Sequence, residues 1–343
     1  QDDPQTGQFR VYAHDPADPR TLSAWSVRCL AEDAEGRLWV GTDQGLCRLD
    51  AERHFFTRLP VNIVDSGALQ SRVVDTVLVD RPGRVWIGTD GGGLSWFDPA
   101  TERFVHYRHS KFSADTLASD KVRRLFEDRY GDLWVGHFPS GVSHANQLAA
   151  PFRVIRARPG ETNTLSDNHV LCFWEDVSGD LWVGTDNGGL NHWNAATGRW
   201  RAYQHDPRDA RSIGGKAVLS VLRDQRGQLW AGAWDGGLNR FEPETGTFHR
   251  YLPDPARVDA LQSPHVWRLA EDQQGQLWLG TSGAGVARYL PQTEGFFHHR
   301  YNWADDHSLN NDYVWSLLVT RDGTLWVGTS AGLARWSAAS GQW

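Results

Sequence analysis

The stretch DVSGDLWVGTDNGGLNHW, residues 176–193, decides the fold because its first tryptophan returns at an almost constant spacing along the chain. The first copy is followed after 47 residues by the second, and five more follow at intervals of 48. The seven copies are Trp39, Trp86, Trp134, Trp182, Trp230, Trp278 and Trp326. A period in the forties that covers nearly the whole chain indicates one repeat protein rather than several unrelated domains.

Each copy carries the same turn and strand signals. Gly stands three residues before the tryptophan in every copy, and Asp stands six residues before it in all copies but the last, which has Thr320. Asp-x-x-Gly between two apolar runs predicts a hairpin turn, in which Asp bonds turn amides and Gly takes a positive φ. Residues 237–251 then show an alternating strand, a turn and a Phe-x-x-Tyr strand. Each repeat therefore predicts four short antiparallel strands, the blade of a β-propeller.

The two ends of the chain predict how the ring of blades closes. Gly7 to Tyr12 has the pattern of a fourth strand, and the seventh repeat reaches Trp343 before completing its own. We predict a single all-β domain over residues 1–343, a seven-bladed β-propeller whose last blade is completed by the N-terminal strand at about residues 7–12. This closure removes an unpaired sheet edge. A β-solenoid is the alternative, but its rungs are shorter and its ends are not complementary.

Composition and charge exclude several classes of protein. With 40% hydrophobic and 22% charged residues, the 343-residue chain has an ordinary globular composition. Its net charge is −7 and it has no basic run, which argues against nucleic acid and anionic lipid as partners. The sequence predicts neither a membrane span nor a signal peptide. Because the chain starts at Gln1 and lacks Met, we expect a mature or excised segment.

The cysteines and the catalytic motifs give no sign of chemistry. Cys29 and Cys172 share one repeat position in blades one and four, too far apart for the Cα separation of about 7 Å that a disulfide allows. With Cys47 on a third strand, we expect three buried free thiols. No nucleophile elbow, phosphate loop or His-Glu-x-x-His segment is present. We therefore predict no catalytic residue, cofactor or metal site, and assign the repeated Asp and Trp residues to turns and packing.

The unit Asp-x-x-Gly-x-Leu-Trp-Val-Gly-Thr-x-x-Gly-Gly-Leu-x-x-Trp, almost unchanged at residues 176–193, resembles the two-component regulator propeller repeat. The resemblance covers all seven repeats. In that family such repeats form the extracytoplasmic sensor region of bacterial histidine kinases, hybrid kinases and some diguanylate cyclases. Two propellers typically precede a β-sandwich domain, a membrane helix and an output module, and several members are thought to sense oligosaccharides. This chain holds one propeller, so the resemblance implies an excised periplasmic domain of a longer receptor.

Candidate ligand residues are expected at positions whose residue type differs from one repeat to the next. The connections from strand four to strand one and from strand two to strand three should lie on the same face, around the mouth of the central channel. The two loop residues before the constant Val of strand one differ between blades. In blades three and five, aromatic residues replace the usual small or polar residues in the connection between strands two and three. An aromatic face beside a polar group suits a sugar ring. Variable solvated loops or a local lid are the alternatives. The predicted ligand residues are Trp25, Arg72, Lys121, His137, Phe138, His169, Trp234, Asp235, His265, Tyr313 and Trp315.

A further column lies one residue inside each first strand. If these side chains point into the channel, one arc of the ring is charged and another is aromatic. Arg123 and the adjacent Arg124 could clamp a carboxylate, or could pair instead with Asp75. The column reads Arg28, Asp75, Arg123, Leu171, Leu219, Trp267 and Trp315.

Three functions compete at this stage. The leading hypothesis is a non-catalytic ligand-sensing domain of a membrane signalling receptor, which binds an oligosaccharide or another small molecule at the channel mouth. The second is a propeller lyase acting on a sugar or an antibiotic, with His137, His169 or His265 as the base. The third is a protein-interaction scaffold that forms a homodimer through one face. No direct membrane insertion is expected in any of them.

Overall fold

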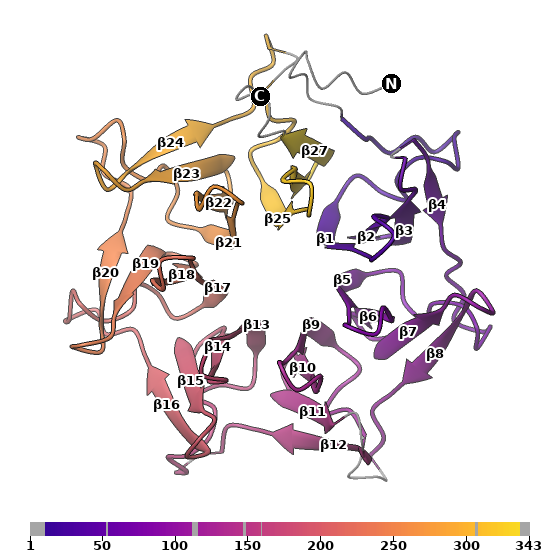
Figure 1. Ribbon diagram of the computed structural model, residues 1–343, viewed down its shortest axis with the longest axis horizontal. Helices are drawn as coiled ribbons and strands as arrows, with labels where there is room; N and C mark the ends of the chain where they lie inside the picture. The colour runs from indigo at the N-terminus through magenta and orange to yellow at the C-terminus, as the bar shows by residue number, and fades with distance from the viewer. Residues whose placement is uncertain are drawn as a thin grey trace.

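The computed structural model describes residues 11–52, 54–111, 116–146, 149–158, 160–305 and 308–336. Within these ranges the regular structure is entirely β, and no helix long and apolar enough to cross a membrane is found. Seven antiparallel sheets stand around a central axis like the blades of a propeller (Figure 1). The predicted seven-bladed β-propeller is confirmed.

Each blade is built outward in chain order, from a strand beside the axis to a strand at the rim (Figure 1). The first strands are β1 (Val27–Glu32), β5 (Val74–Val79), β9 (Val122–Glu127), β13 (Val170–Glu175), β17 (Val218–Arg223), β21 (Val266–Glu271) and β25 (Val314–Val319). The second strands are β2 (Leu38–Thr42), β6 (Val85–Thr89), β10 (Leu133–His137), β14 (Leu181–Thr185), β18 (Leu229–Ala233), β22 (Leu277–Thr281) and β26 (Leu325–Thr329).

The third and fourth strands form the outer half of each blade. The third strands are β3 (Gly45–Leu49), β7 (Leu94–Asp98), β11 (Val142–Asn146), β15 (Leu190–Asn194), β19 (Gly237–Glu242), β23 (Val286–Leu290) and β27 (Gly332–Trp336). The fourth strands are β4 (Phe56–Arg58), β8 (Arg103–Tyr107), β12 (Ala149–Ile155), β16 (Arg199–Tyr203), β20 (Thr247–Tyr251) and β24 (Gly295–His299).

The seventh blade is joined to the beginning of the chain. Tyr12 forms an antiparallel bridge to Leu333 of β27, with N···O distances of 3.2 and 3.3 Å in the two directions. The Tyr12 ring packs between Trp326 of blade seven and Phe56 of blade one, at centroid distances of 5.8 and 5.5 Å. The bridge agrees with closure by the N-terminal strand. Residues 7–10 of that predicted strand lie outside the described residues.

Neighbouring blades meet through a contact between valine and glycine close to the axis. The Val that opens each first strand is buried and lies against the Gly of the Trp-Val-Gly segment in the preceding blade. A methyl group on that Gly would come within 2.5 to 3.0 Å of the Val Cγ1 atom in all seven blades. Gly328 and Val27 make this contact between the last blade and the first. The repeat therefore needs Gly for blade packing as well as for turns.

The repeated Trp is held by the repeated Asp. In the first blade, Trp39 Nε1 donates to Asp33 Oδ2 at 2.8 Å, and Asp33 Oδ1 accepts the amide of Arg37 at 2.9 Å. The same Trp–Asp bond is found in blades two, three, five and six at 2.7 to 2.9 Å. The predicted turn and packing roles are confirmed, and the indole bond adds a link between them. In blade four, Trp182 Nε1 has no hydrogen-bond partner.

The three cysteines are free, as predicted. Cys47 and Cys172 are buried, whereas Cys29 is only partly buried, so the expectation of three buried thiols is corrected at that position. Burial raises the pKa of both Cys29 and Cys172 to about 12, which keeps these thiols protonated.

His137 does not lie in an exposed connection, contrary to the expectation that it faces the channel mouth. It is the last residue of β10, is completely buried, and its Nε2 lies 2.8 Å from Ser143 Oγ. Five other blades place a buried Thr at this position, such as Thr89, whose hydroxyl donates to Gly93 O at 3.0 Å. His137 therefore replaces an interior hydroxyl. Burial lowers the pKa of His137 to about 4.

We expect Gly232→Ala to destabilise the fold. The added methyl would meet the Val266 side chain at 2.8 Å and its carbonyl at 2.9 Å, and overpacking of this kind costs about 1–3 kcal/mol. Urea unfolding measures the loss. The control is Val258→Ala, at a side chain that is 96% exposed. Equal midpoints for the two variants would contradict the importance of the interblade contact.

Asp272→Ala should also lower the free energy of unfolding. It leaves the buried Trp278 indole and the amides of Gln274 and Gln276 without their acceptor, and each unsatisfied buried group costs about 1–3 kcal/mol. The change is measured by thermal and urea unfolding. A loss below about 0.5 kcal/mol would show that the turn does not depend on this carboxylate.

His137→Thr should reduce the acid sensitivity of the protein. Unfolded His137 takes up a proton near pH 6.5, whereas the folded residue does so only near pH 4. Its contribution to stability is therefore complete above pH 6.5 and declines as the pH falls towards 4. As the pH falls from 6.5 to 4, the free energy of unfolding should therefore decrease more in the wild type than in the variant. Parallel pH profiles would contradict the burial of a neutral imidazole.

Candidate functional site

Every first strand carries a β-bulge one residue after its opening Val. The pairing register of β1 with β2 shifts between Val27 and Cys29, which leaves Arg28 as the extra residue. The same shift occurs in the other six blades. Bulges redirect side chains and are frequent beside functional sites. The bulge residues are Arg28, Asp75, Arg123, Leu171, Leu219, Trp267 and Trp315.

Backbone hydrogen bonds join the two kinds of connection in which ligand residues were predicted, the one before each first strand and the one between strands two and three. In blade five, Trp234 N donates to Ala217 O, which precedes the first strand of the same blade, at 2.9 Å. Gly237 N donates to Pro264 O, which precedes the first strand of the next blade, at 2.8 Å. Each connection between strands two and three thus sits between two entries to first strands. Side chains from adjacent blades are brought together on this face, which we call the channel mouth.

An aromatic arc spans the mouth in blades five to seven. The Trp234 indole stacks on the His265 ring, with a centroid distance of 4.0 Å and an interplanar angle of 20°. Trp267 meets Trp234 edge-on at 5.8 Å and Trp315 edge-on at 4.8 Å. Trp234 remains 37% exposed. The arc is a fixed, partly open aromatic surface built across blades and not a lid on one blade.

Polar groups hold the ends of the aromatic arc. Asp235 N donates to His265 Nδ1 at 3.2 Å, and the Asp235 carboxylate lies 3.3 Å from the same nitrogen. Asp235 adopts φ +57°, a conformation that Asp tolerates better than most residues. At the other end, Trp315 Nε1 donates to Ser330 Oγ at 2.7 Å. Four predicted ligand residues, Trp234, Asp235, His265 and Trp315, are therefore gathered at one place.

A charged arc occupies the bulge column of blades one to three. Buried Asp75 accepts Arg28 Nε at 2.8 Å and Arg123 Nη1 at 2.7 Å. Arg124 turns away from this pair and donates to the carbonyls of Asp75 and Arg123 at 3.3 and 2.6 Å. The two adjacent arginines do not form one clamp, and the alternative pairing with Asp75 is the observed one. With two guanidinium groups around one carboxylate, the arc keeps a net positive charge.

Phe138 and His169 lie beside the charged arc. Their ring centroids are 4.6 Å apart, and the Arg123 guanidinium lies 5.6 Å from the centre of the Phe138 ring. His169 Nδ1 is 2.9 Å from the Asp167 carboxylate. This second group joins blades three and four. It contains two of the predicted ligand residues, and Arg123 comes from the bulge column.

The remaining predicted residues are exposed at the same loops. Trp25 packs edge-on against His14 at 5.8 Å, and Lys121 Nζ is 3.5 Å from the Asp90 carboxylate. Arg72 and Tyr313 are exposed. The Lys121 carbonyl accepts the amide of Phe138 at 3.1 Å, and the Tyr313 carbonyl accepts the amide of Ser330 at 3.1 Å. The part of these four residues in binding stays a prediction.

Sequence reasoning missed a second hollow, on the face of the Asp-x-x-Gly turns. A cleft of about 430 Å³ lies between blades three and four, and we call it the interblade cleft. Turn residues of both blades, the end of β12 and the connection that follows it line the cleft. A comparison of the repeat columns away from the mouth could have found it, because Asp132 and His144 depart from the residues that most other blades carry. Its principal side chains are Asp132, Trp134, His144, Ile155, Trp193 and Trp200.

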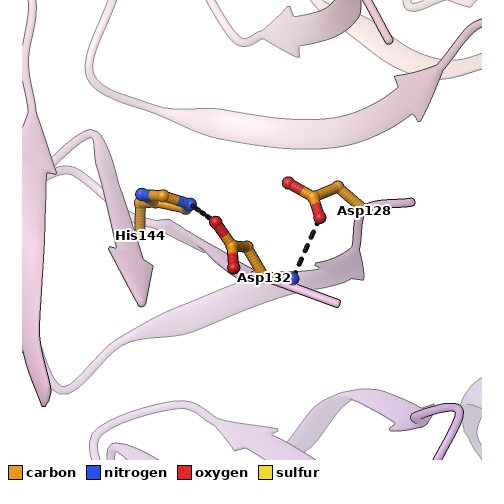
Figure 2. A group of neighbouring side chains, drawn as sticks. All are labelled: Asp128, Asp132 and His144. Carbon is orange, nitrogen blue, oxygen red and sulfur yellow. Dashed lines mark hydrogen bonds and ion pairs between the residues drawn. The ribbon is translucent and has the colours of Figure 1, made fainter. Parts of the chain in front are cut away.

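An acidic and histidine group at this cleft has the composition of a metal site. The ligand atoms of Asp128, Asp132 and His144 lie within 4.8 Å of one another, and His144 Nε2 is 3.0 Å from Asp132 (Figure 2). Both Asp128 oxygens already accept protein hydrogen bonds, from Trp134 Nε1 and from the turn amides of Tyr130 and Asp132. The group is therefore accounted for as a turn that supports Trp134.

The equivalent group in blade four is similarly engaged. Asp180 accepts His192, Asn194 and the amide of Ala195. The ring of His192 stacks on Trp182 at 4.3 Å, as His144 packs on Trp134 at the same distance. In both blades the Asp–His pair covers the face of the repeated tryptophan.

Comparison with solved structures finds the same fold in sensor proteins and in enzymes. The extracellular domain of the predicted hybrid two-component system BT3049 from B. thetaiotaomicron is 20% identical, with a TM-score of 0.79 over 96% of this chain and 42% of that chain. The corresponding domain of BT4673 is 21% identical, with a TM-score of 0.73 over 96% and 40% of the two chains. A streptogramin B lyase is 13% identical, with a TM-score of 0.67 over 96% and 98%.

These identities establish the fold alone, and the chain spans about two fifths of the length of the two sensor domains. No curated protein sequence matches the chain. The family model described as two component regulator propeller matches residues 23–44, 116–138, 260–283 and 308–331. The three intervening repeats carry the same Gly and Trp-x-Gly positions. Repeats that match the two-component regulator propeller model therefore occur in the first, third, sixth and seventh blades.

Proposed function

We propose that the protein is the ligand-sensing propeller of an extracytoplasmic bacterial receptor, and that it binds an oligosaccharide at the channel mouth without transforming it. The observation that carries the proposal is the aromatic arc, in which Trp234 is fixed by His265 and Trp267 while part of its ring stays open. A rigid indole costs little conformational entropy when it contacts a ligand. Its face packs on the apolar C–H groups of a sugar ring.

The polar groups around the arc suit the rest of such a ligand. The Asp235 carboxylate is largely exposed next to Trp234, where it can accept hydroxyl protons. Across the channel, Arg28 and Arg123 surround a single carboxylate, so their remaining donors would favour an acidic sugar. The hydroxyl groups of a neutral oligosaccharide, or the hydroxyl and carboxylate groups of a uronic one, can contact both the Asp235 carboxylate and the arginine donors.

The sensor assignment is supported by the family and by the two-component systems that share the fold. Their extracellular domains are more than twice the length of this chain. A parent protein would then supply further propeller, sandwich, membrane and output domains. Ligand binding at the mouth would act on those domains through the propeller surface, and the propeller itself needs no catalytic group.

A lyase is the second candidate, favoured by one observation. The chain matches nearly the full length of streptogramin B lyase, and His169 is paired with Asp167 in a way that could orient a base. A related structure is that of virginiamycin B lyase with quinupristin. Incubation of the protein with quinupristin, followed by liquid chromatography and tandem mass spectrometry, separates the candidates, because ring opening by elimination leaves the mass unchanged but alters retention and fragmentation. The sensor proposal expects unchanged antibiotic, and a ring-opened isomer that is lost in His169→Ala would favour the lyase.

Trp234→Ala should weaken binding with little effect on stability. A stacked aromatic side chain contributes about 1–3 kcal/mol, which corresponds to a loss of affinity of about five- to 150-fold. The ligand is chosen by a thermal-shift screen of neutral and uronic oligosaccharides, and the affinity is then measured by calorimetry.

The matched control is Phe55→Ala, which removes an exposed aromatic ring from a turn at the rim of blade one. It should bind as the wild type does. Normal binding by Trp234→Ala, or equal losses in both variants, would show that the mouth is not the binding site.

A further inference from the structure

We propose that the interblade cleft between blades three and four is a second saccharide site, which accepts a mono- or disaccharide. Turn residues of both blades, the end of β12 and the connection after it line this cleft, and none of the ligand residues predicted for the mouth is among them. The inference is therefore independent of the function proposed for the mouth. It rests on the space, the aromatic wall and the polar rim of the cleft.

Blade three lacks a ring that four other blades carry at the outer strand beside this cleft. Where Ile155 pairs with Val142, four blades have a Tyr whose ring packs on the repeated Trp of the same blade. Their centroid distances are 5.8 to 5.9 Å, in the pairs Tyr12–Trp326, Tyr107–Trp86, Tyr203–Trp182 and Tyr251–Trp230. Ile155 supplies no ring at that position, and it lines the cleft together with Val154 of the outer strand β12.

Blades five and six show what the tyrosine does. The cleft between them, about 440 Å³, is lined by turn residues and by β18, β19, β22 and β23, and no residue of β20 is among them. There Tyr251 occupies the position of Ile155, and its hydroxyl contacts Arg240 at 3.0 Å and Glu294 at 3.2 Å. The two clefts have similar volumes, but the fourth strand contributes lining residues only to the cleft beside blade three.

Three indoles form the wall of the open cleft. Trp134 lies 5.9 Å from Trp193, which lies 6.5 Å from Trp200, and all three line the space. Trp193 and Trp200 are only partly buried. The His144 ring covers part of the Trp134 face at 4.3 Å. The volume of the cleft, about 430 Å³, falls within the usual range for small-molecule pockets, about 300–1,000 Å³.

The polar rim favours a neutral hydroxylated ligand over an ion. The acidic residues Asp132 and Glu161 and the basic residues Arg156 and Arg158 line the same cleft, and Arg158 Nη1 lies 3.3 Å from Glu161 Oε1. A bare anion would meet the carboxylates, and a bare cation would meet the arginines. Sugar hydroxyls both donate and accept, so they can use both sets. His144 engages Asp132 through one oxygen at 3.0 Å, and the other oxygen points away from this bond (Figure 2).

The test introduces at position 155 the tyrosine that four other blades contain there. Ile155→Tyr should fill the cleft with the ring of blades two, four and five and should preserve the fold. Leu59→Tyr is the matched control, because Leu59 holds the equivalent position in blade one. Glucose, galactose, xylose, maltose and cellobiose are the probes, followed by intrinsic tryptophan fluorescence and calorimetry. Wild-type protein should bind at least one of them, and Ile155→Tyr should lose about tenfold or more in affinity, with Leu59→Tyr unchanged.

Two outcomes would overturn the proposal: no binding of any probe to the wild type, or equal binding to the wild type and Ile155→Tyr. If Ile155→Tyr does not fold, as judged by circular dichroism, Trp200→Ala carries the same expectation. Trp234→Ala separates the two sites. Loss of probe binding in Trp234→Ala but not in Ile155→Tyr would place the saccharide at the mouth and reject the cleft, whereas the reverse pattern would support the cleft alone.

Discussion

The contact between the Gly of one blade and the Val of the next is the constraint on which the rest of the structure depends. Only a residue without a side chain lets the second strand of one blade come so close to the first strand of the next. The contact recurs in all seven blades and includes the join between the last and the first, so it sets the spacing of the ring. The repeated Trp, bound through its indole to the turn Asp in five blades, then fills the wider space farther from the axis.

A fixed framework of this kind leaves certain positions free to differ. Each first strand carries a bulge residue after its opening Val, and none of these side chains is needed for the Val–Gly contact. The protein places charge on one arc of the channel and aromatic rings on the other. Trp234, stacked between blades on His265, is the clearest case of a side chain that is held rigidly yet remains open to solvent.

Much of the fold could be predicted from the sequence because the conformation at many repeat positions depends only on residues that are near in the sequence. The turn at Asp33 and Gly36 and the period of the tryptophans need only neighbouring residues. The role of Gly41 could not be read in the same way, because its partner Val74 lies in the next blade. His137 was wrongly expected at the surface: a change of residue type marked the position as unusual, but the sequence does not show on which side of the strand the ring lies. The interblade cleft was missed because its lining residues, such as Trp134 and Trp193, come from two blades and are far apart in the sequence.

A crystal structure of the protein with the oligosaccharide that binds most tightly in the thermal-shift screen tests the central claim most directly. We predict a sugar ring in van der Waals contact, about 4 Å, with the open face of Trp234, and hydroxyl groups within hydrogen-bond distance of Asp235. A complex in which the channel mouth holds no sugar, and the ligand lies only on the face of the Asp-x-x-Gly turns, would contradict it.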